Sequence, residues 1–453
     1  MRVAIVGTGY VGLVSGACLA DVGHDVTCVD VDADKVDMIN SGQPTIHEPG
    51  LVELLATNVG SRLRATTDLG QAVRNSEVTF IAVGTPACNG RIDLAYVEAA
   101  ASEIGRIIAD MPGFHTVVVK STVIPGTTDG VVRSALERSS GRRAGSGFGL
   151  GMNPEFLTEG SAVRDFANPD RIVIGGIDER SQRKIADLYA SFGVAPKILC
   201  NNTTAEFIKY GSNAVLATAI SFANELSRLC RAVGNVDVAD VMRGVHASSY
   251  LTTPQAGGEP VVAGLASFFE AGCGFGGSCL PKDVTALVGQ GQDLGVALPL
   301  LSAVLEVNRG QPDEMLRLLD SHLPQLRGVE VAVLGIAFKP DTDDVRESPA
   351  FPVIDLLRDR GANVVAYDPV ARPVGHPGLR DVRLAESLDD AVGSAEAVLL
   401  VTRWAEFGNL ADVLDRLGRA PLVVDGRRVL DPARFSRYEG IGRSLVDVGE
   451  ADR

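Results

Sequence analysis

Short apolar, β-branched runs alternate with helical patterns through the first third of the chain. The runs lie at residues 3–6, 26–29, 78–83, 117–119 and 171–174. Such alternation is typical of βαβ units, in which a helix connects two parallel strands. The pattern therefore predicts a doubly wound α/β domain with a parallel sheet at the amino-terminal end.

A long helical pattern follows this region. Residues 203–233 are rich in Ala and nearly free of Gly and Pro, and Thr203 and Glu206 have the spacing of a capping box. We expect a long buried helix here, and a loop at 247–264, which is rich in Ser, Thr, Pro and Gly. Helical patterning resumes from 283 to about 319, with breaks expected at Pro299 and Pro312.

Strand patterns return at 329–334 and 363–367, which predicts a second α/β domain. Residues 69–81 and 388–400 share one helix-turn-strand pattern. Two related nucleotide-binding domains are therefore expected, one on each side of a helical region.

Composition narrows the class of protein. A chain of 453 residues is longer than a domain with a single hydrophobic core usually is, so two or three domains are expected. Its residues are 45% hydrophobic and 22% charged, which is ordinary for a soluble globular protein. No apolar run reaches the roughly 20 residues of a membrane span, and the first residues read as a strand rather than a signal peptide. We expect a cytoplasmic protein.

Charge and cysteine usage exclude further classes. The net charge of -15 disfavours binding to nucleic acid or to an acidic membrane. The seven cysteines include no CxxC pair, which argues against a disulfide framework and against a zinc site. No metal is expected.

The first strand leads into a dinucleotide-binding fingerprint. Gly7, Gly9 and Gly12 stand between the strand and a helix, and Asp30 ends the second strand. Glycines let the backbone approach a pyrophosphate, and an acidic residue at position 30 favours NAD over NADP. Lys35 adds a charge near the ribose or is a solvated helix lysine.

Two threonines follow strands of the same domain. Thr85 and Thr122 lie on the sheet edge where open α/β sheets bind ligands. Each is either a ligand contact or a capping hydroxyl.

The stretch 274–283 contains the strongest candidate for chemistry. Pro281 suits the first turn of a helix, so Cys279 is expected at a helix N-terminus, where the dipole favours a thiolate. Cys279 is then a nucleophile, and the alternative is a buried structural cysteine. Asp283 lies on the same helix face as Cys279. It either orients a water or a lysine, or its negative charge only stabilises the positive end of the helix dipole at the first turn.

Two further pairs carry polar groups at helical spacing. Lys209 and Asn213 share one face of the long helix. They either donate hydrogen bonds that stabilise an oxyanion, or they are structural. In the structural alternative Lys209 extends its ammonium to solvent and Asn213 is hydrogen-bonded within the protein. Glu155 and Glu159 stand four residues apart, suited to holding a water or acting as a base, or to a capped helix start.

Together these segments resemble the UDP-glucose/GDP-mannose dehydrogenase family over essentially the full length. Besides the fingerprint, the resemblance rests on the motifs at 83–86, 121–127, 153–157, 170–175, 276–283, 335–349 and 425–428. It implies two Rossmann-like doubly wound domains joined by a central all-α dimerisation domain. The expected limits are 1–198 for the NAD domain, 199–310 for the central domain and 311–453 for the nucleotide-sugar domain.

The resemblance implies a four-electron oxidation of a nucleotide sugar at C6. A first NAD takes a hydride from C6, and Cys279 attacks the resulting aldehyde to form a thiohemiacetal. A second NAD takes a hydride from the thiohemiacetal, which gives a thioester. Water then hydrolyses the thioester and releases the acid. The implied conversion is UDP-glucose to UDP-glucuronate; TDP-glucose, GDP-mannose and UDP-N-acetylmannosamine are alternatives within the class. A two-electron hydroxyacid dehydrogenase and a nucleotide-sugar sensor are alternatives outside it. A homodimer is also implied.

Residue roles are implied by position in the family motifs. The implied catalytic residues are Cys279, Lys209, Asn213, Asp283, Thr122, Glu155 and Glu159. The implied cofactor contacts are Gly7, Gly9, Tyr10, Val11, Gly12, Asp30, Lys35, Thr85, Thr122, Glu159, Lys282 and Arg346. The implied substrate contacts are Glu155, Phe156, Leu157, Thr158, Lys209, Asn213, Phe268, Phe269, Gly272, Gly276 and Lys339.

Two positions depart from the family pattern. Ala263 stands where many members carry an arginine that reaches the partner's substrate, and the loop before it is longer than usual. Thr158 stands where Arg or Ala is common. These departures leave the nucleotide open.

Overall fold

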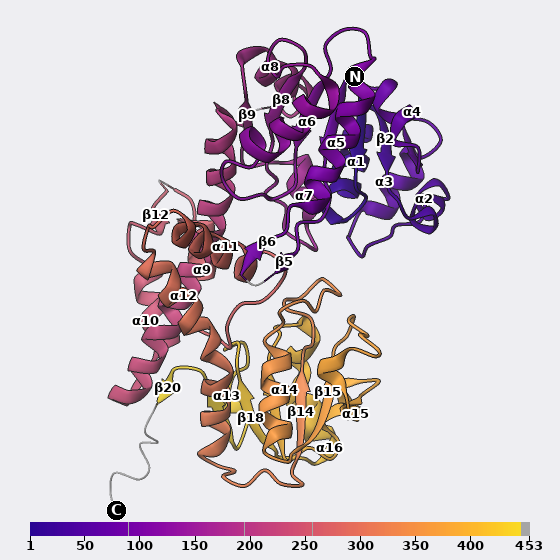
Figure 1. The fold of residues 1–453 in the computed structure, drawn as a ribbon. Helices are drawn as coiled ribbons and strands as arrows, with labels where there is room; N and C mark the ends of the chain where they lie inside the picture. Colours follow the sequence, from indigo (N-terminus) through magenta and orange to yellow (C-terminus); the bar gives the residue numbers. More distant parts are fainter. Residues whose placement is uncertain (89, 194, 256, 445–453) are drawn as a thin grey trace, which may run out of the picture. The chain divides into compact units, whose positions relative to one another are not determined.

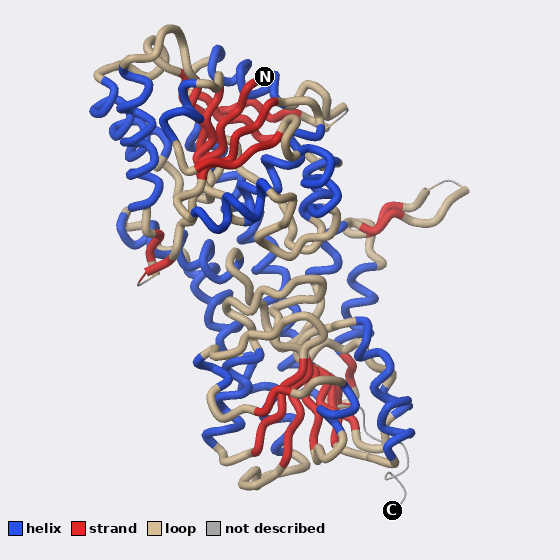
Figure 2. Tube along the Cα trace, turned by 90° about the vertical axis from the view of Figure 1, so that its right-hand side faces the viewer, coloured by secondary structure: helices blue, strands red, loops and turns tan. Residues whose placement is uncertain are grey.

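The computed structural model describes residues 1–88, 90–193, 195–255 and 257–444. The chain divides into two compact units, Met1–Ser212 and Asn213–Arg453. In each unit a central sheet is enclosed by helices (Figure 1, Figure 2). The predicted α/β class with a parallel sheet in each half is confirmed.

The first unit contains an eight-stranded sheet in the order β10-β9-β8-β7-β4-β1-β2-β3. All neighbours are parallel except β8 and β9, so the expectation of a parallel sheet is wrong for this one pair. The strands are β1 (Arg2–Val6), β2 (Asp25–Val29), β3 (Leu63–Thr66), β4 (Val78–Ile81), β7 (Thr116–Val119), β8 (Gly149–Met152), β9 (Ile172–Gly176) and β10 (Lys197–Cys200).

All five predicted strands of this sheet are present. The sequence did not predict β3, β8 and β10, nor the short separate strands β5 (Ala87–Cys88) and β6 (Arg91–Ile92). Strand β8 contains two glycines, and a Cβ at Gly151 would overlap the side chain of Ile185. The glycines are there because neighbouring side chains pack closely against this strand. The sequence of the strand therefore lacks the run of apolar β-branched residues that predicts a strand. The helices of this unit are α1 (Tyr10–Asp21), α2 (Ala33–Asn40), α3 (Leu51–Asn58), α4 (Leu69–Arg74), α5 (Ala95–Ala109), α6 (Arg133–Ser140), α7 (Ala162–Ala167) and α8 (Glu179–Leu188).

The second unit contains a six-stranded parallel sheet in the order β16-β15-β14-β17-β18-β19. Its strands are β14 (Glu330–Leu334), β15 (Asn363–Tyr367), β16 (Arg383–Leu384), β17 (Ala397–Leu400), β18 (Leu422–Asp425) and β19 (Tyr438–Gly440). Helices α14 (Ala350–Asp359), α15 (Leu388–Val392) and α16 (Leu410–Leu417) flank it (Figure 1). Both predicted strands are present.

The internal similarity corresponds to equivalent places in the two sheets. Residues 69–81 form α4 and β4, and residues 388–400 form α15 and β17. Strand β4 pairs with the central β1, and β17 pairs with the central β14. The shared helix-turn-strand pattern is therefore confirmed.

The central helices include α9 (Asn202–Val233), which has 32 residues and confirms the predicted long helix. The expected capping box is wrong, because the helix begins before Thr203 and Asn201 Oδ1 accepts from the Thr204 amide. The helix is also only partly buried. The exposed apolar side chains on it are Phe207, Val215, Phe222, Leu229 and Val233.

Shorter helices complete this region: α10 (Val238–His246), α11 (Leu280–Asp293), α12 (Pro299–Arg309) and α13 (Gln311–Asp320). Pro299 and Pro312 lie in the first turns of α12 and α13, so the predicted breaks are confirmed. Residues 247–264 are not entirely a loop. They contain the hairpin of β12 (Thr252–Thr253) and β13 (Val261–Val262).

Within the described part of the chain, no helix combines the length and apolar character that a membrane crossing requires.

Glu206, near the start of α9, is completely buried. Its carboxylate accepts hydrogen bonds from the backbone amides of Gly126 at 2.6 Å and Thr128 at 2.8 Å. Burial raises the pKa of Glu206 to about 7, against these hydrogen bonds, which lower it. The folded protein therefore holds this proton more tightly than the unfolded chain does.

We expect the free energy of unfolding to fall as pH rises from about 4.5 to about 7, because the folded chain must release a proton that the unfolded chain has already lost. The shift corresponds to about 3 kcal/mol. Urea denaturation at pH 5, 6, 7 and 8 measures it. Glu206→Gln should flatten the dependence and exposed Glu103→Gln should keep it; an unchanged slope in Glu206→Gln would contradict the assignment.

Candidate active site

The fingerprint glycines form a close turn between β1 and α1. Gly7 has φ +100°, and a Cβ there would lie 2.7 Å from the carbonyl oxygen of Ala82. A Cβ at Gly12 would overlap the carbonyl oxygen of Gly7. Gly9, by contrast, faces open space just before Tyr10 and Val11, the first residues of α1. A backbone exposed at a helix N-terminus suits the approach of a pyrophosphate.

Asp30 follows β2 beside this turn. One carboxylate oxygen accepts hydrogen bonds from the amide of Thr8, at 2.9 Å, and from its hydroxyl. Burial acts to raise the pKa of Asp30, but these bonds and the charge of Lys35 hold it below its ordinary value. An ionised, half-buried carboxylate at this place fits the ribose hydroxyls of NAD. The residues present therefore fit the cofactor.

The two glycines allow folding and binding to be separated. Gly12→Ala should lower both the melting temperature and the affinity for NAD, because its Cβ has no room. Gly9→Ala should fold normally, since its Cβ meets no atom within 4 Å, and yet bind NAD more weakly. Thermal unfolding and a fluorescence titration with NAD measure the two effects. Wild-type NAD affinity in both variants would count against this turn as the cofactor site.

Glu48 is a buried residue of this region that the sequence did not reveal. The Tyr10 hydroxyl hydrogen-bonds its carboxylate, which also accepts from the Gly160 amide at 2.8 Å. The contact connects the first turn of α1 to the segment that contains Glu155 and Glu159. No local motif announces it, because its partners lie 38 and 112 residues away.

The two threonines expected at the sheet edge do lie together. They follow the neighbouring strands β4 and β7, and the Thr85 hydroxyl donates to the carbonyl oxygen of Thr122 at 2.9 Å. This hydrogen bond joins the two loops that follow β4 and β7, and the role of Thr85 toward a ligand stays a prediction. Thr122 is half-buried.

Glu155 and Lys209 form a buried ion pair with 2.9 Å between Oε1 and Nζ. Burial acts to raise the pKa of Glu155, but the ammonium of Lys209 holds it below its usual range. The other Glu155 oxygen accepts from the Leu157 amide at 2.6 Å. The Lys209 ammonium is 5.6 Å from the centre of the Phe156 ring. Thr158 is exposed, and its amide donates to Asp165 Oδ2 at 3.1 Å.

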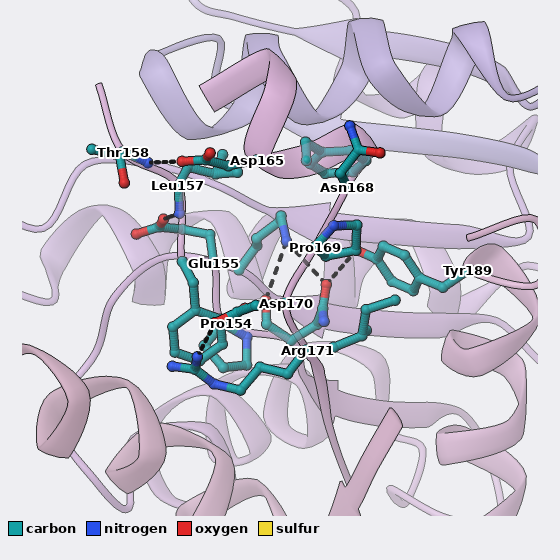
Figure 3. A pocket seen from close by; sticks show the side chains of 15 residues that line it. Pro154, Glu155, Leu157, Thr158, Asp165, Asn168, Pro169, Asp170, Arg171 and Tyr189 are labelled. Carbon is teal, nitrogen blue, oxygen red and sulfur yellow. Dashed lines mark hydrogen bonds and ion pairs between the residues drawn. The ribbon is translucent and has the colours of Figure 1, made fainter. Parts of the chain in front are cut away.

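The segment from Glu155 to Thr158 lines a cavity of about 300 Å³ in the first unit. In Figure 3 the segment from Glu155 to Thr158 and the ring of Tyr189 lie on opposite sides of it. Glu159 is half-buried at the end of this segment. The segment is a loop, so the alternative of a capped helix start at Glu155 is wrong.

Cys279 stands at the N-cap of α11, and its side chain is exposed. This confirms the predicted helix-start position. The glycines before it are required by packing: a Cβ at Gly276 would overlap the carbonyl of Glu347, and one at Gly277 would lie 2.7 Å from the Phe338 ring. The loop is thereby pressed against residues 338–349.

Asp283 is 1% exposed and bridges two side chains. One oxygen accepts from Lys282 Nζ at 2.7 Å and the other from Asn213 Nδ2 at 2.6 Å. One buried carboxylate therefore contacts both Lys282 and Asn213. Lys209 and Asn213 lie one turn apart on α9; Lys209 contacts Glu155, and Asn213 contacts Asp283.

The remaining predicted contacts occupy several places in the second unit. Arg346 pairs with Asp344, and the Lys339 ammonium lies 5.9 Å from the Phe338 ring. Phe268 is half-buried, Phe269 packs against Phe222, and the Gly272 amide donates to Asn224 Oδ1 at 2.7 Å.

Arg427 was not singled out for a role by sequence, although it lies in a family motif. Its guanidinium donates to the carbonyl oxygens of Val401 at 2.5 Å and Gly274 at 3.0 Å. The Cys273 amide also donates to Gly426 at 2.9 Å. Arg427 therefore anchors the loop that carries Cys279 to the edge of the second sheet.

Comparison with known proteins identifies the family. Models of the UDP-glucose/GDP-mannose dehydrogenase family match residues 1–193 as its NAD binding domain, 203–310 as its central domain and 332–432 as its UDP binding domain. The chain belongs to this family. It is an NAD-dependent nucleotide-sugar 6-dehydrogenase.

Relatives of this family with different substrates in their names are similar to the chain. A UDP-glucose 6-dehydrogenase of Haloferax volcanii is 42% identical over 97% of this chain and 100% of the relative. A GDP-mannose 6-dehydrogenase of Azotobacter vinelandii is 38% identical over 96% of this chain and 97% of the relative. A solved UDP-glucose dehydrogenase of Pyrobaculum islandicum aligns with TM-score 0.88 and 41% identity over 97% of both chains.

Proposed function

We propose that this enzyme converts UDP-glucose to UDP-glucuronate in two oxidations, through a thioester on Cys279. The observation that carries the proposal is the exposed thiol at the N-cap of α11, one turn before the buried Asp283 with its bonds to Lys282 and Asn213. A thiol at a helix N-terminus is placed where the thiolate is favoured. NAD, when bound, supplies the hydride acceptor for each oxidation.

The chain's own groups account for the remaining steps. The Cys279 thiolate adds to the C6 aldehyde, and the resulting thiohemiacetal is oxidised to a thioester. Water then adds to the thioester carbonyl, the C–S bond breaks, and the acid leaves with the thiol restored. In sum, one alcohol, one water and two NAD⁺ give one carboxylic acid, two NADH and two protons.

Lys209 and Asn213 are proposed to stabilise the oxyanions of these steps, as ammonium and amide donors. Thr122, Glu155 and Glu159 are proposed to hold the attacking water and its proton. Asp283 is proposed to keep Asn213 and Lys282 in place, which its two short bonds support. A covalent intermediate retains the reactive aldehyde carbon on the protein.

The choice of UDP-glucose is supported by relatives of that name at 39–42% identity over 97–98% of this chain. GDP-mannose 6-dehydrogenases range from 37% to 41% identity, and the one at 41% covers 81% of this chain. TDP-glucose, GDP-mannose and UDP-N-acetylmannosamine are the alternatives, since Ala263 and Thr158 depart from the family pattern. A panel of these four nucleotide sugars, scored by NAD reduction, tests the substrate. Reduction with GDP-mannose alone would refute UDP-glucose.

Counting NADH tests the reaction. Two NADH per substrate consumed support the thioester route, and one NADH would support a two-electron hydroxyacid-type dehydrogenase. Binding without any NADH would indicate a sensor. Only two NADH per substrate consumed would agree with a thioester mechanism on Cys279.

We further propose that the chain is divided into three domains, at residues 1–198, 199–310 and 311–453.

We also propose that the protein is a homodimer. Val215, Phe222 and Leu229 are exposed at intervals of seven residues along α9, a spacing that suits pairing with a helix of a second copy. Leu229→Glu should shift the mass measured by light scattering from dimer to monomer. A wild-type monomer would refute the dimer.

A further inference from the structure

Lys120 is a buried lysine that the proposed reaction does not use. It directly follows β7, and it is 3% exposed. Its ammonium donates to the side-chain oxygen of Asn153 at 3.0 Å and to the Asn153 carbonyl at 3.4 Å. Both hydrogen bonds thus end on the first residue of the segment that contains Glu155. A buried ammonium held only by neutral acceptors is costly unless a negative charge lies near.

The Asn153 side chain is held from three sides. Besides Lys120, the Tyr189 hydroxyl donates to Asn153 Oδ1 at 2.5 Å, and Asn153 Nδ2 donates to the carbonyl of Val173 at 2.8 Å. The ammonium also lies 5.8 Å from the centre of the Phe80 ring. Lys120 and Tyr189 therefore share one acceptor, but only Lys120 brings a charge.

The negative charge that compensates Lys120 is Glu155. Burial lowers the pKa of Lys120 to about 8, and the carboxylate of Glu155 acts to raise it, while Lys209 lowers it further. Conversely, burial acts to raise the pKa of Glu155, and Lys209 first and Lys120 after it hold that pKa below its usual range. Lys209 contacts the Glu155 carboxylate at 2.9 Å, and Lys120 lines the same cavity as Glu155.

We propose that Lys120 is a positioning residue of the reaction, which fixes Asn153 and supplies the second positive charge beside Glu155. The proposal rests on the proposed role of Glu155 in the reaction. Lys209 holds Glu155 directly, and Lys120 acts through the backbone and through space. The remaining charged groups that line the same cavity are Asp165, Asp170 and Arg171.

Lys120→Met tests the charge, because it keeps the length of the side chain and removes the ammonium. Tyr189→Phe is the matched control, since it removes a hydrogen bond to the same Asn153 oxygen without changing charge. The measurement is kcat/KM from pH 3.5 to 10 with the nucleotide sugar that the panel identifies, together with the melting temperature at each pH.

At low pH, kcat/KM is expected to fall as Glu155 becomes protonated, and we call this fall the acid limb. In Lys120→Met the acid limb should move up by about one pH unit, because loss of the ammonium raises the pKa of Glu155. Tyr189→Phe should leave the limb in place even if it lowers the melting temperature, and Lys120→Arg should restore it. A wild-type acid limb in Lys120→Met, or the same displacement in Tyr189→Phe, would overturn the proposal.

Two further measurements keep the test decisive if Lys120→Met does not fold. Lys120→Gln retains a donor to Asn153 and should still displace the acid limb. In the wild-type enzyme, kcat/KM should fall above about pH 8, where Lys120 loses its proton, and a constant value to pH 10 would overturn the proposal. If the wild-type enzyme oxidises no nucleotide sugar, the proposed function fails instead, which is a distinct result.

Discussion

Cys279→Ala is expected to abolish formation of the carboxylate while NAD binding remains at the wild-type level. Loss of an essential nucleophile commonly costs several orders of magnitude, and we expect a fall of at least about a thousandfold in acid produced. Gly7, Gly12 and Asp30, which fit the cofactor, belong to the first unit, so NAD affinity should not change. Chromatographic assay of the acid and a titration with NAD measure the two quantities.

Cys230→Ala is the matched control for this variant. Cys230 lies on α9, and burial raises its pKa, so it has no feature of an activated thiol. The control should retain full activity. Normal acid production by Cys279→Ala would overturn the thioester mechanism, whereas loss of activity in both variants would point to a general effect of removing cysteines.

Lys209→Met is expected to lower both the rate and the stability. Breaking a buried ion pair leaves the Glu155 carboxylate without its nearest ammonium, which costs about 3 kcal/mol of unfolding free energy. Loss of an oxyanion donor should lower kcat on the order of a hundredfold or more. Urea denaturation and steady-state kinetics measure the two effects.

The double variant Lys209→Met, Glu155→Gln separates these effects. It removes both charges of the buried pair, so stability should recover most of the loss while activity does not return. Lys184→Met breaks the half-exposed pair with Glu77 at 3.5 Å and should cost less than about 1 kcal/mol. Recovery of activity in the double variant would show that Lys209 serves only to neutralise Glu155.

The features that the sequence predicted correctly are local. The fingerprint turn depends on Gly7 and Gly12, whose missing Cβ atoms are visible in the sequence itself. Cys279 was placed at a helix start because Pro281 and the preceding glycines specify that start within a few residues. Strands such as β15 were found because an apolar run of β-branched residues is a short-range signal.

The errors concern interactions between distant residues. Thr203 and Glu206 have the spacing of a capping box, but Glu206 instead accepts amides about 80 residues earlier in the chain. The long helix α9 was expected to be buried, yet it exposes an apolar stripe. Neither spacing nor composition can distinguish these cases, because each depends on which surface the fold brings close.

Two acidic residues show this limit within one pattern. Asp30 follows β2 and Asp368 follows β15, and each accepts a backbone amide from the glycine turn after the first strand of its sheet. Asp30 is half-buried beside an open backbone, whereas Asp368 is fully buried and also accepts from the indole of Trp404 at 3.0 Å. Only the tertiary structure distinguishes the carboxylate that fits a ribose from the one that holds a loop.

The sequence by itself determined the two mainly parallel sheets, the long helix, the glycine turn after β1 and the cysteine at a helix start, because periodicity and the positions of glycine and proline act over a few residues. The tertiary structure alone decided that Lys209 meets Glu155, that Asn213 meets Asp283, and that Lys120 lies buried beside Asn153. These partners are 33 to 70 residues apart in the chain, and the packing of the folded units sets their charges and distances.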